Sequence, residues 1–130
     1  MTDKIPATLL AGDGIGPEIM ASVTTVLDAL GAPFVWDHQS AGMGALESLG
    51  SALPDATLES IARTGLVLKG PLTTPVGKGF RSINVTLRQQ FDLYANVRPT
   101  QTIVPGGRYE NVDLVVIREN VEGLYAAMEH

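Results

Sequence analysis

The chain has 130 residues, of which 45% are apolar and 18% are charged, and it contains no cysteine. Such a composition suits a globular protein and excludes a disordered chain, disulfides and thiolate metal sites. The net charge of −5 argues against nucleic acid as a partner, and no apolar run approaches the ~20 residues that cross a bilayer. The first ten residues lack a secretion signal, so we expect a cytoplasmic protein with no membrane partner.

The first half of the sequence alternates short apolar strands with helices. Pro17 suits the first turn of a helix, where its missing N–H costs nothing, and Gly31 suits the end of that helix. Asp55 is typical of a helix N-cap, and Gly65 of a helix end. The expected elements are, in order, a strand at 5–11, a helix at 17–30, a strand at 34–37, a short helix at 44–49, a helix at 55–64 and a strand at 66–68.

The second half begins with a loop at 69–79 that is rich in turn-forming residues. A helix is expected at 82–91, followed by strands at 93–97 and 114–117. A loop containing Pro-Gly-Gly separates these two strands. Strands that alternate with helices indicate an α/β layered fold with parallel pairing.

The basic residues are concentrated in the middle of this acidic chain. Residues 1–68 hold two basic residues against eight acidic ones, whereas residues 69–118 hold seven basic residues against three acidic ones. A protein of net charge −5 therefore contains a central segment of net charge +4. This asymmetry suggests that the segment binds an anion.

Two glycine-containing loops are open to two interpretations. The stretch GDGIGPE at 12–18 has G-x-G-x-G spacing and not the G-x-G-x-x-G of a dinucleotide fingerprint. It is either a tight strand-to-helix turn alone, or a turn whose amides or Ile15 contact a ligand. The loop KGPLTTPVGKG at 69–79 is either a surface connection or a ligand-contacting loop, since it directly precedes the basic segment.

Five polar residues of the basic segment suit one small, multiply charged anion. Ser82, Asn84 and Arg88 lie at i, i+2 and i+6, and a helix that begins near Ser82 would offer its N-terminal amides to a carboxylate or phosphate. Arg98 and Arg118 follow the ends of expected strands, where ligands of parallel α/β sheets bind. Guanidinium groups bind carboxylates in pairs of hydrogen bonds. The alternative is that the arginines are scattered over the surface.

Tyr125 follows Arg118 by seven residues. It could donate a proton, although an isolated tyrosine is more often a packed aromatic residue. His38 and His130 have no companions at metal-ligand spacing, so we interpret both as bystanders.

Three segments resemble, in order, the N-terminal portion of the isocitrate/isopropylmalate dehydrogenase family. They are GDGIGPE, KGPLTTPVGKGFRSINVTLRQQFDLYANVRP and DLVVIRENVEGLYAAMEH. The resemblance as a whole extends over essentially the whole chain. Ser-Ile-Asn at 82–84 resembles the isocitrate branch, because the isopropylmalate branch would place apolar residues there. The resemblance implies that family's layered α/β fold with parallel strands, which is not a Rossmann fold and is incomplete in this chain. Residues 1–97 would form the N-terminal part of the large domain, and residues 98–130 the start of the small domain.

The resemblance also implies roles for individual residues. Ser82 and Asn84 would bind the carboxylate that distinguishes isocitrate from related substrates. The other carboxylates and the rest of the substrate would be bound by Arg88, Arg98, Arg118 and Lys69.

The same resemblance implies contacts with the cofactor and one catalytic group. Thr74, Leu72 and Ile15 would lie against the nicotinamide end of NAD or NADP. Tyr125 would be the general acid that protonates the enolate after carbon dioxide leaves. In some members of the family the serine that matches Ser82 is phosphorylated, which would add negative charge and repel the substrate.

The implied activity is NAD(P)-dependent oxidative decarboxylation of isocitrate to 2-oxoglutarate, assisted by Mg²⁺ or Mn²⁺. The family's metal-binding aspartates, catalytic lysine and adenosine-binding segment have no counterpart in this chain. We therefore expect no metal ligand here, an inactive isolated chain, and a homodimer or pairing with a complementary chain. Two alternatives stay open: a short, non-catalytic tricarboxylate-binding or regulatory subunit, and an isopropylmalate or tartrate dehydrogenase.

Overall fold

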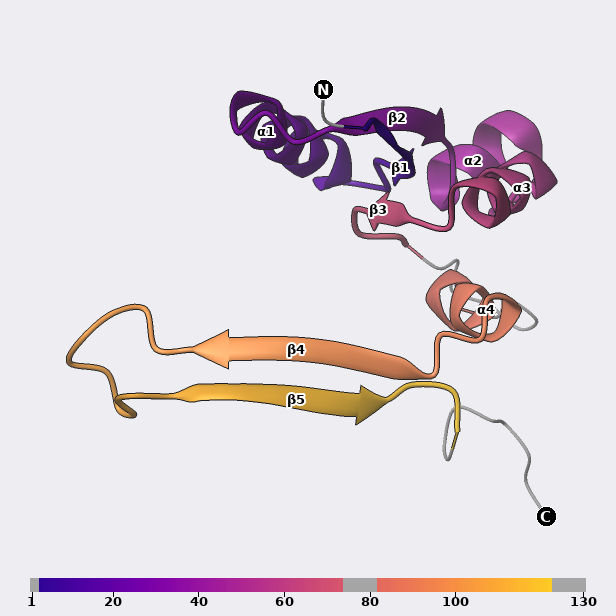
Figure 1. The fold of residues 1–130 in the computed structure, drawn as a ribbon. Helices are drawn as coiled ribbons and strands as arrows, with labels where there is room; N and C mark the ends of the chain where they lie inside the picture. Colours follow the sequence, from indigo (N-terminus) through magenta and orange to yellow (C-terminus); the bar gives the residue numbers. More distant parts are fainter. Residues whose placement is uncertain (1–2, 74–81, 123–130) are drawn as a thin grey trace, which may run out of the picture. The chain divides into compact units, whose positions relative to one another are not determined.

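The computed structural model describes residues 3–73 and 82–122. The chain divides into two compact units, Met1–Ile83 and Asn84–His130. The first is a small parallel sheet with helices, and the second consists of most of one helix and a β hairpin (Figure 1).

The sheet of the first unit has three parallel strands in the order β2-β1-β3. These are β1 (Ile5–Leu10), β2 (Phe34–Gln39) and β3 (Val67–Lys69). The central strand β1 contributes four buried residues, and Leu10, its last residue, pairs with Gln39 on one side and Lys69 on the other. The predicted parallel pairing is confirmed for these strands.

Helices lie on both sides of this sheet. They are α1 (Gly16–Ala29), α2 (Met43–Leu49) and α3 (Asp55–Thr64). Figure 1 shows α1 on one side of the strands and α2 with α3 on the other. This arrangement is the expected α/β layered fold.

The start of α3 differs by one residue from the prediction. Pro54 occupies the N-cap position with extended backbone, and Asp55 is the first residue of the helix. The Asp55 carboxylate still lies in the first turn, where it faces the positive end of the helix dipole. Gly65 ends the helix in the left-handed conformation, with φ of 64°, as predicted.

A buried polar network joins α3 to the sheet. Ser60 donates a hydrogen bond to the Asp37 carboxylate over 2.6 Å, which uses its only hydroxyl proton. The Thr8 hydroxyl, 2.7 Å away, must therefore donate to Ser60. Thr8 and Ser60 are fully buried, and Arg63 forms an ion pair with Asp37. These contacts fix α3 against both β1 and β2, and the sequence analysis did not predict them.

The second unit contains a β hairpin. The helix α4 (Ile83–Gln90) precedes β4 (Ala95–Gln101) and β5 (Asp113–Glu119). The two strands pair antiparallel, with Ala95 opposite Glu119 and Gln101 opposite Asp113. Parallel pairing was expected for the whole chain, and it is wrong here because the loop at 102–112 contains no helix to make a parallel crossover.

The strand β4 runs past Pro99 to Gln101, four residues beyond its predicted end at 97. Proline cannot donate a hydrogen bond to a sheet ladder, which favoured an earlier end. It is tolerated because, among the described residues, β5 is the one strand that pairs with β4. The predicted domain boundary between 97 and 98 falls within this strand, and it stays a prediction for the complete fold. Within the described part of the chain, every helix is too short or too polar to span a membrane.

Candidate functional site

The expected site residues belong to both units. The first unit contains Ile15, Lys69, Leu72 and Ser82. In the second unit lie Asn84, Arg88, Arg98 and Arg118. Thr74 and Tyr125 are outside the described residues.

The hairpin brings two of the arginines to one face. Asn96 pairs with Arg118, and Arg98 pairs with Val116. Because side chains alternate along a strand, Asn96, Arg98 and Arg118 share a face of the hairpin. Arg98 and Arg118 are diagonal neighbours, a relation in which Cβ atoms lie roughly 7–8 Å apart. Two guanidinium groups at this spacing can bind one multiply charged anion.

The reason for this proximity differs from the predicted one. Arg98 was expected at the carboxyl end of a parallel strand, whereas it lies in the middle of β4. Antiparallel register, and not a common sheet edge, gathers the two arginines. We call the face formed by Asn96, Arg98 and Arg118 the arginine face.

Asn96 is a member of the arginine face that the sequence analysis missed. Its Oδ1 accepts a hydrogen bond from Arg98 Nε over 3.2 Å. This bond occupies the Nε edge of the guanidinium and directs the terminal Nη groups to other acceptors. The i, i+2 spacing of Asn96 and Arg98 in a strand was the available signal.

The helix α4 supplies a second set of polar groups. Ser82 directly precedes the helix, so the prediction of a helix start near Ser82 is confirmed. Asn84 and Arg88 are four residues apart and therefore lie on the same helical face, and both are half-buried. Ile83 and Leu87, also four apart, are 4% and 6% exposed and anchor the helix through its apolar side.

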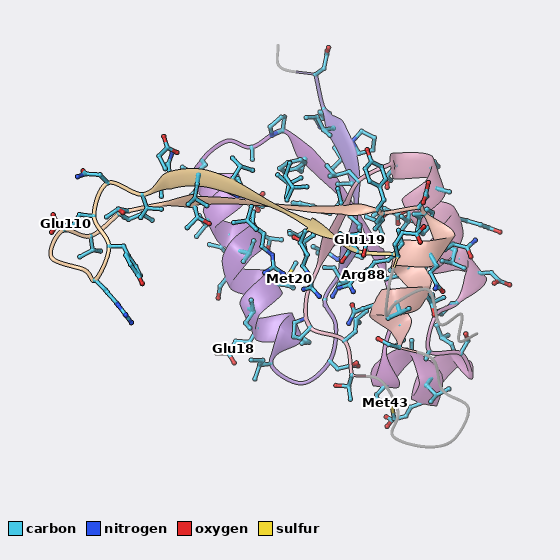
Figure 2. The ribbon with its side chains drawn as sticks, turned by 90° about the horizontal axis from the view of Figure 1, so that it is seen from below. Glu18, Met20, Met43, Arg88, Glu110 and Glu119 are labelled. Atoms are coloured by element: carbon cyan, nitrogen blue, oxygen red, sulfur yellow. The ribbon has the colours of Figure 1, made fainter. Side chains whose placement is uncertain are left out.

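A hydrogen-bonded chain connects α4 to the end of the hairpin. Leu93 N donates to Arg88 O over 2.8 Å, and Leu93 O accepts a hydrogen bond of 3.1 Å from Asn120 Nδ2. Asn120 is 6% exposed and directly follows β5. In Figures 1 and 2, α4 lies near the end of the hairpin at which β4 begins and β5 ends. These hydrogen bonds connect the backbone of Arg88 with the residue that follows β5.

Glu119 does not oppose the arginine face. Because Glu119 neighbours Arg118 in β5, it points to the other side of the hairpin. Its carboxylate accepts hydrogen bonds from the backbone N–H groups of Glu122 and Val121, over 2.6 and 2.5 Å. These bonds hold the pKa of Glu119 below its ordinary value. The charge of Glu119 stabilises the turn after β5.

In the first unit, the expected ligand contacts lie at the carboxyl edge of the parallel sheet. Lys69 is the last residue of β3 and lies beside Leu10, the last residue of β1. Lys69 Nζ donates a hydrogen bond of 2.8 Å to Gly70 O. Ile15, in the turn after β1, is 67% exposed, and Leu72, after β3, is half-buried. In parallel α/β sheets, ligands commonly bind at this edge.

The turn after β1 and the loop after β3 touch each other closely. Gly70 N donates to Leu10 O and Asp13 N donates to Pro71 O, each over 2.8 Å. Gly12 has a φ of 82°, and a Cβ atom there would overlap the Pro71 carbonyl oxygen. The first glycine of GDGIG is therefore required by a tight turn and by the approach of a second backbone. The structural interpretation of this motif is supported, and the exposure of Ile15 is compatible with an additional ligand contact.

The described residues do not provide a metal site by themselves. No group of three or more His, Cys, Asp or Glu side chains is gathered within residues 3–73 and 82–122. The ligands of a bound Mg²⁺ or Mn²⁺ would therefore have to come at least in part from outside these residues.

Comparison with known proteins identifies a matching family and similar relatives. The chain matches the family described as isocitrate/isopropylmalate dehydrogenase over residues 6–130. Isocitrate dehydrogenase (NAD) catalytic subunit 5, mitochondrial, from Arabidopsis thaliana is 49% identical over 131 residues, which cover 99% of this chain and 35% of the relative. The 3-isopropylmalate dehydrogenase, chloroplastic, from Solanum tuberosum is 47% identical, with 99% of this chain and 36% of the relative covered.

A solved structure matches the fold as well. The crystal structure of isocitrate dehydrogenase from Methylococcus capsulatus superposes with a TM-score of 0.85 at 54% sequence identity. The match covers 96% of this chain and 37% of that chain. The chain thus spans about a third of the length of the relatives it matches.

Proposed function

Because the chain belongs to the isocitrate/isopropylmalate dehydrogenase family, we propose that it supplies the tricarboxylate-binding residues of an NAD(P)-dependent isocitrate dehydrogenase. The reaction would oxidise the 2-hydroxyl of isocitrate and release carbon dioxide to give 2-oxoglutarate. We also propose that the protein acts in the cytoplasm, as a homodimer or paired with a complementary chain.

The arginine face is the observation that carries this proposal. Isocitrate has three carboxylates, and each of them loses its hydration when the substrate enters a closed site. Guanidinium groups compensate for this loss with paired, charge-assisted hydrogen bonds. Arg98 and Arg118 share one face, and Arg88 belongs to the same unit. A cluster of positively charged arginines in a chain of net charge −5 suits a tricarboxylate better than a neutral substrate.

The remaining residues have defined roles in the proposed reaction. Ser82 and Asn84 would hydrogen-bond the carboxylate that a 3-isopropylmalate substrate lacks. Ile15, Leu72 and Thr74 would contact the nicotinamide, which accepts the hydride from the hydroxyl-bearing carbon. The resulting β-keto acid loses carbon dioxide and leaves an enolate.

Two further residues and a divalent metal ion would contact the substrate or the enolate formed from it. Tyr125 would protonate the enolate carbon as a general acid. Lys69, at the end of β3, would contact the substrate. A bound Mg²⁺ or Mn²⁺ would neutralise the charge of the enolate.

A second candidate is 3-isopropylmalate dehydrogenase, because the Solanum tuberosum relative matches almost as well as the isocitrate enzymes. The polar pair Ser82 and Asn84 argues against it. An isopropyl group placed against these side chains would displace water from their polar atoms, which costs free energy.

The proposal is tested on the protein purified from its native source. Its intact mass is measured first, and its activity is then assayed with isocitrate, NAD or NADP, and Mg²⁺ or Mn²⁺. We expect a mass well above 13.7 kDa together with reduction of one dinucleotide. A mass of 13.7 kDa with isocitrate binding but no turnover would support a short, non-catalytic subunit instead.

A further inference from the structure

Asp13 joins three segments that lie far apart in the sequence. Its Oδ2 accepts hydrogen bonds from Thr73 N over 2.7 Å and from Met43 N over 3.1 Å. Its Oδ1 accepts a hydrogen bond from Gly44 N over 3.1 Å. One carboxylate thus connects the turn after β1, the start of α2 and the loop after β3.

The surroundings of Asp13 are adapted to a carboxylate. Gly42 has a φ of 94°, and a Cβ atom there would overlap the Asp13 carboxyl group. The N-cap residue of α2 makes no side-chain hydrogen bond, so Asp13 supplies the acceptor for the first two N–H groups of the helix. A negative charge is also favourable at this positive end of the helix.

Asp13 stays ionised at neutral pH. Its partial burial raises its pKa, but hydrogen bonds from the backbone of Thr73, Gly44 and Met43 outweigh this effect, and the pKa lies below its ordinary value. The carboxylate is therefore available as an acceptor for all three N–H groups.

The segments that Asp13 joins are those that carry the expected cofactor contacts. Ile15 lies two residues after Asp13, and Leu72 and Thr74 flank Thr73. Asp13 N also donates to Pro71 O over 2.8 Å, so the side chain and main chain of Asp13 hold the same loop.

We propose that Asp13 is a positioning residue of the cofactor site. Its carboxylate fixes the loop at 70–73 relative to the turn that carries Ile15, so that both segments meet the nicotinamide in a set geometry. This role rests on the proposed dehydrogenase function, because it needs a dinucleotide bound at this sheet edge. A purely structural role would lower the amount of folded protein and leave the KM of the folded fraction unchanged.

The test introduces Asp13→Asn and Asp13→Ala into the gene of the source organism, and the resulting proteins are purified. Asp13→Asn keeps the shape of the side chain but turns an NH₂ group towards backbone donors. Asp28→Asn is the matched control, because Asp28 is an exposed residue near the end of α1. Hydrogen exchange of the segments at 43–46 and 70–73 and the KM for the dinucleotide and for isocitrate are measured for each protein.

We expect Asp13→Asn to accelerate exchange in both segments and to raise the dinucleotide KM about tenfold, the effect of one lost charge-assisted hydrogen bond. The isocitrate KM should change less, and Asp28→Asn should behave as the wild type. A dinucleotide KM equal to that of the control would overturn the proposal, even if the variant is less stable, because KM does not depend on the amount of folded enzyme.

The two proposals fail in different ways. A wild-type protein that binds a dinucleotide but does not oxidise isocitrate contradicts the proposed function alone. In that case, the effect of Asp13→Asn is measured as a change in the dissociation constant of the dinucleotide and not in its KM. A wild-type protein that binds neither NAD nor NADP overturns both proposals.

Discussion

Asn96→Asp should weaken isocitrate binding by placing a carboxylate within the arginine face. Asn96 lies directly opposite Arg118, and its Oδ1 already accepts a hydrogen bond from Arg98 Nε. An aspartate of the same shape would keep that bond and add a negative charge beside both guanidinium groups. It would attract the terminal Nη groups that the substrate needs and repel the carboxylates of the substrate.

The magnitude follows from the hairpin geometry. Directly opposed residues have Cβ atoms about 5 Å apart, so a substrate carboxylate bound by Arg118 would lie roughly 5–7 Å from the new charge. At an effective dielectric constant of about 20, this repulsion is roughly 2–3 kcal/mol before screening by salt. We expect the dissociation constant of isocitrate to rise between about 10-fold and 100-fold.

The matched variants separate charge from shape. Asn96→Ala removes only the acceptor for Arg98 Nε and should raise the dissociation constant by roughly 2–10-fold. Asn111→Asp adds the same charge in the hairpin loop, at an exposed residue whose φ of 57° aspartate tolerates, and should leave binding unchanged. Calorimetric titration with isocitrate at low and high salt measures these effects. Equal affinity of Asn96→Asp and Asn111→Asp would show that the arginine face does not bind the substrate.

Three further predictions concern stability, pH and regulation. Thr8→Val removes a buried hydroxyl that is hydrogen-bonded to Ser60 and Thr64, over 2.7 and 2.9 Å. Urea titrations should show a free energy of unfolding that is lower by about 1–2 kcal/mol. The control Thr25→Val, which removes an exposed hydroxyl, should lower this free energy by less. The pKa of Asp13 is lower in the folded protein, so its contribution to stability is complete above about pH 5 and is lost as the pH falls below about 4. Asp13→Asn should therefore show a shallower loss of stability between about pH 5 and 3, and an equally steep loss would contradict this reasoning. Ser82→Asp should raise the KM for isocitrate at least about tenfold by charge repulsion, and an unchanged KM would remove Ser82 from the substrate site.

Local patterns were sufficient to predict most of the secondary structure. The apolar run before GDGIG, the proline at 17 and the glycine at 65 each act on the backbone near them, and the strands and helices of the first unit form where these signals place them. Ile83 and Leu87 are buried on α4, and their spacing follows the helical period.

Long-range contacts could not be predicted from local sequence patterns. Asp13 accepts hydrogen bonds from residues 30, 31 and 60 positions away, which no local pattern encodes. The bond from Ser60 to Asp37 likewise depends on how α3 packs on the sheet. Arg98 and Arg118 share a face of the hairpin because the two strands are antiparallel, and strand direction depends on how the loop at 102–112 closes. The role of each substrate residue stays a prediction that rests on the family resemblance.

The most direct test of the substrate assignment compares isocitrate with 3-isopropylmalate. The ratio of their kcat/KM values is measured on the protein from its native source, with the preferred dinucleotide and divalent metal. If Ser82 and Asn84 bind the carboxylate that 3-isopropylmalate lacks, and the arginines bind the other two, isocitrate should be preferred by at least about 100-fold. A preference for 3-isopropylmalate would contradict the account, and it would assign these polar groups a role other than recognition of a tricarboxylate.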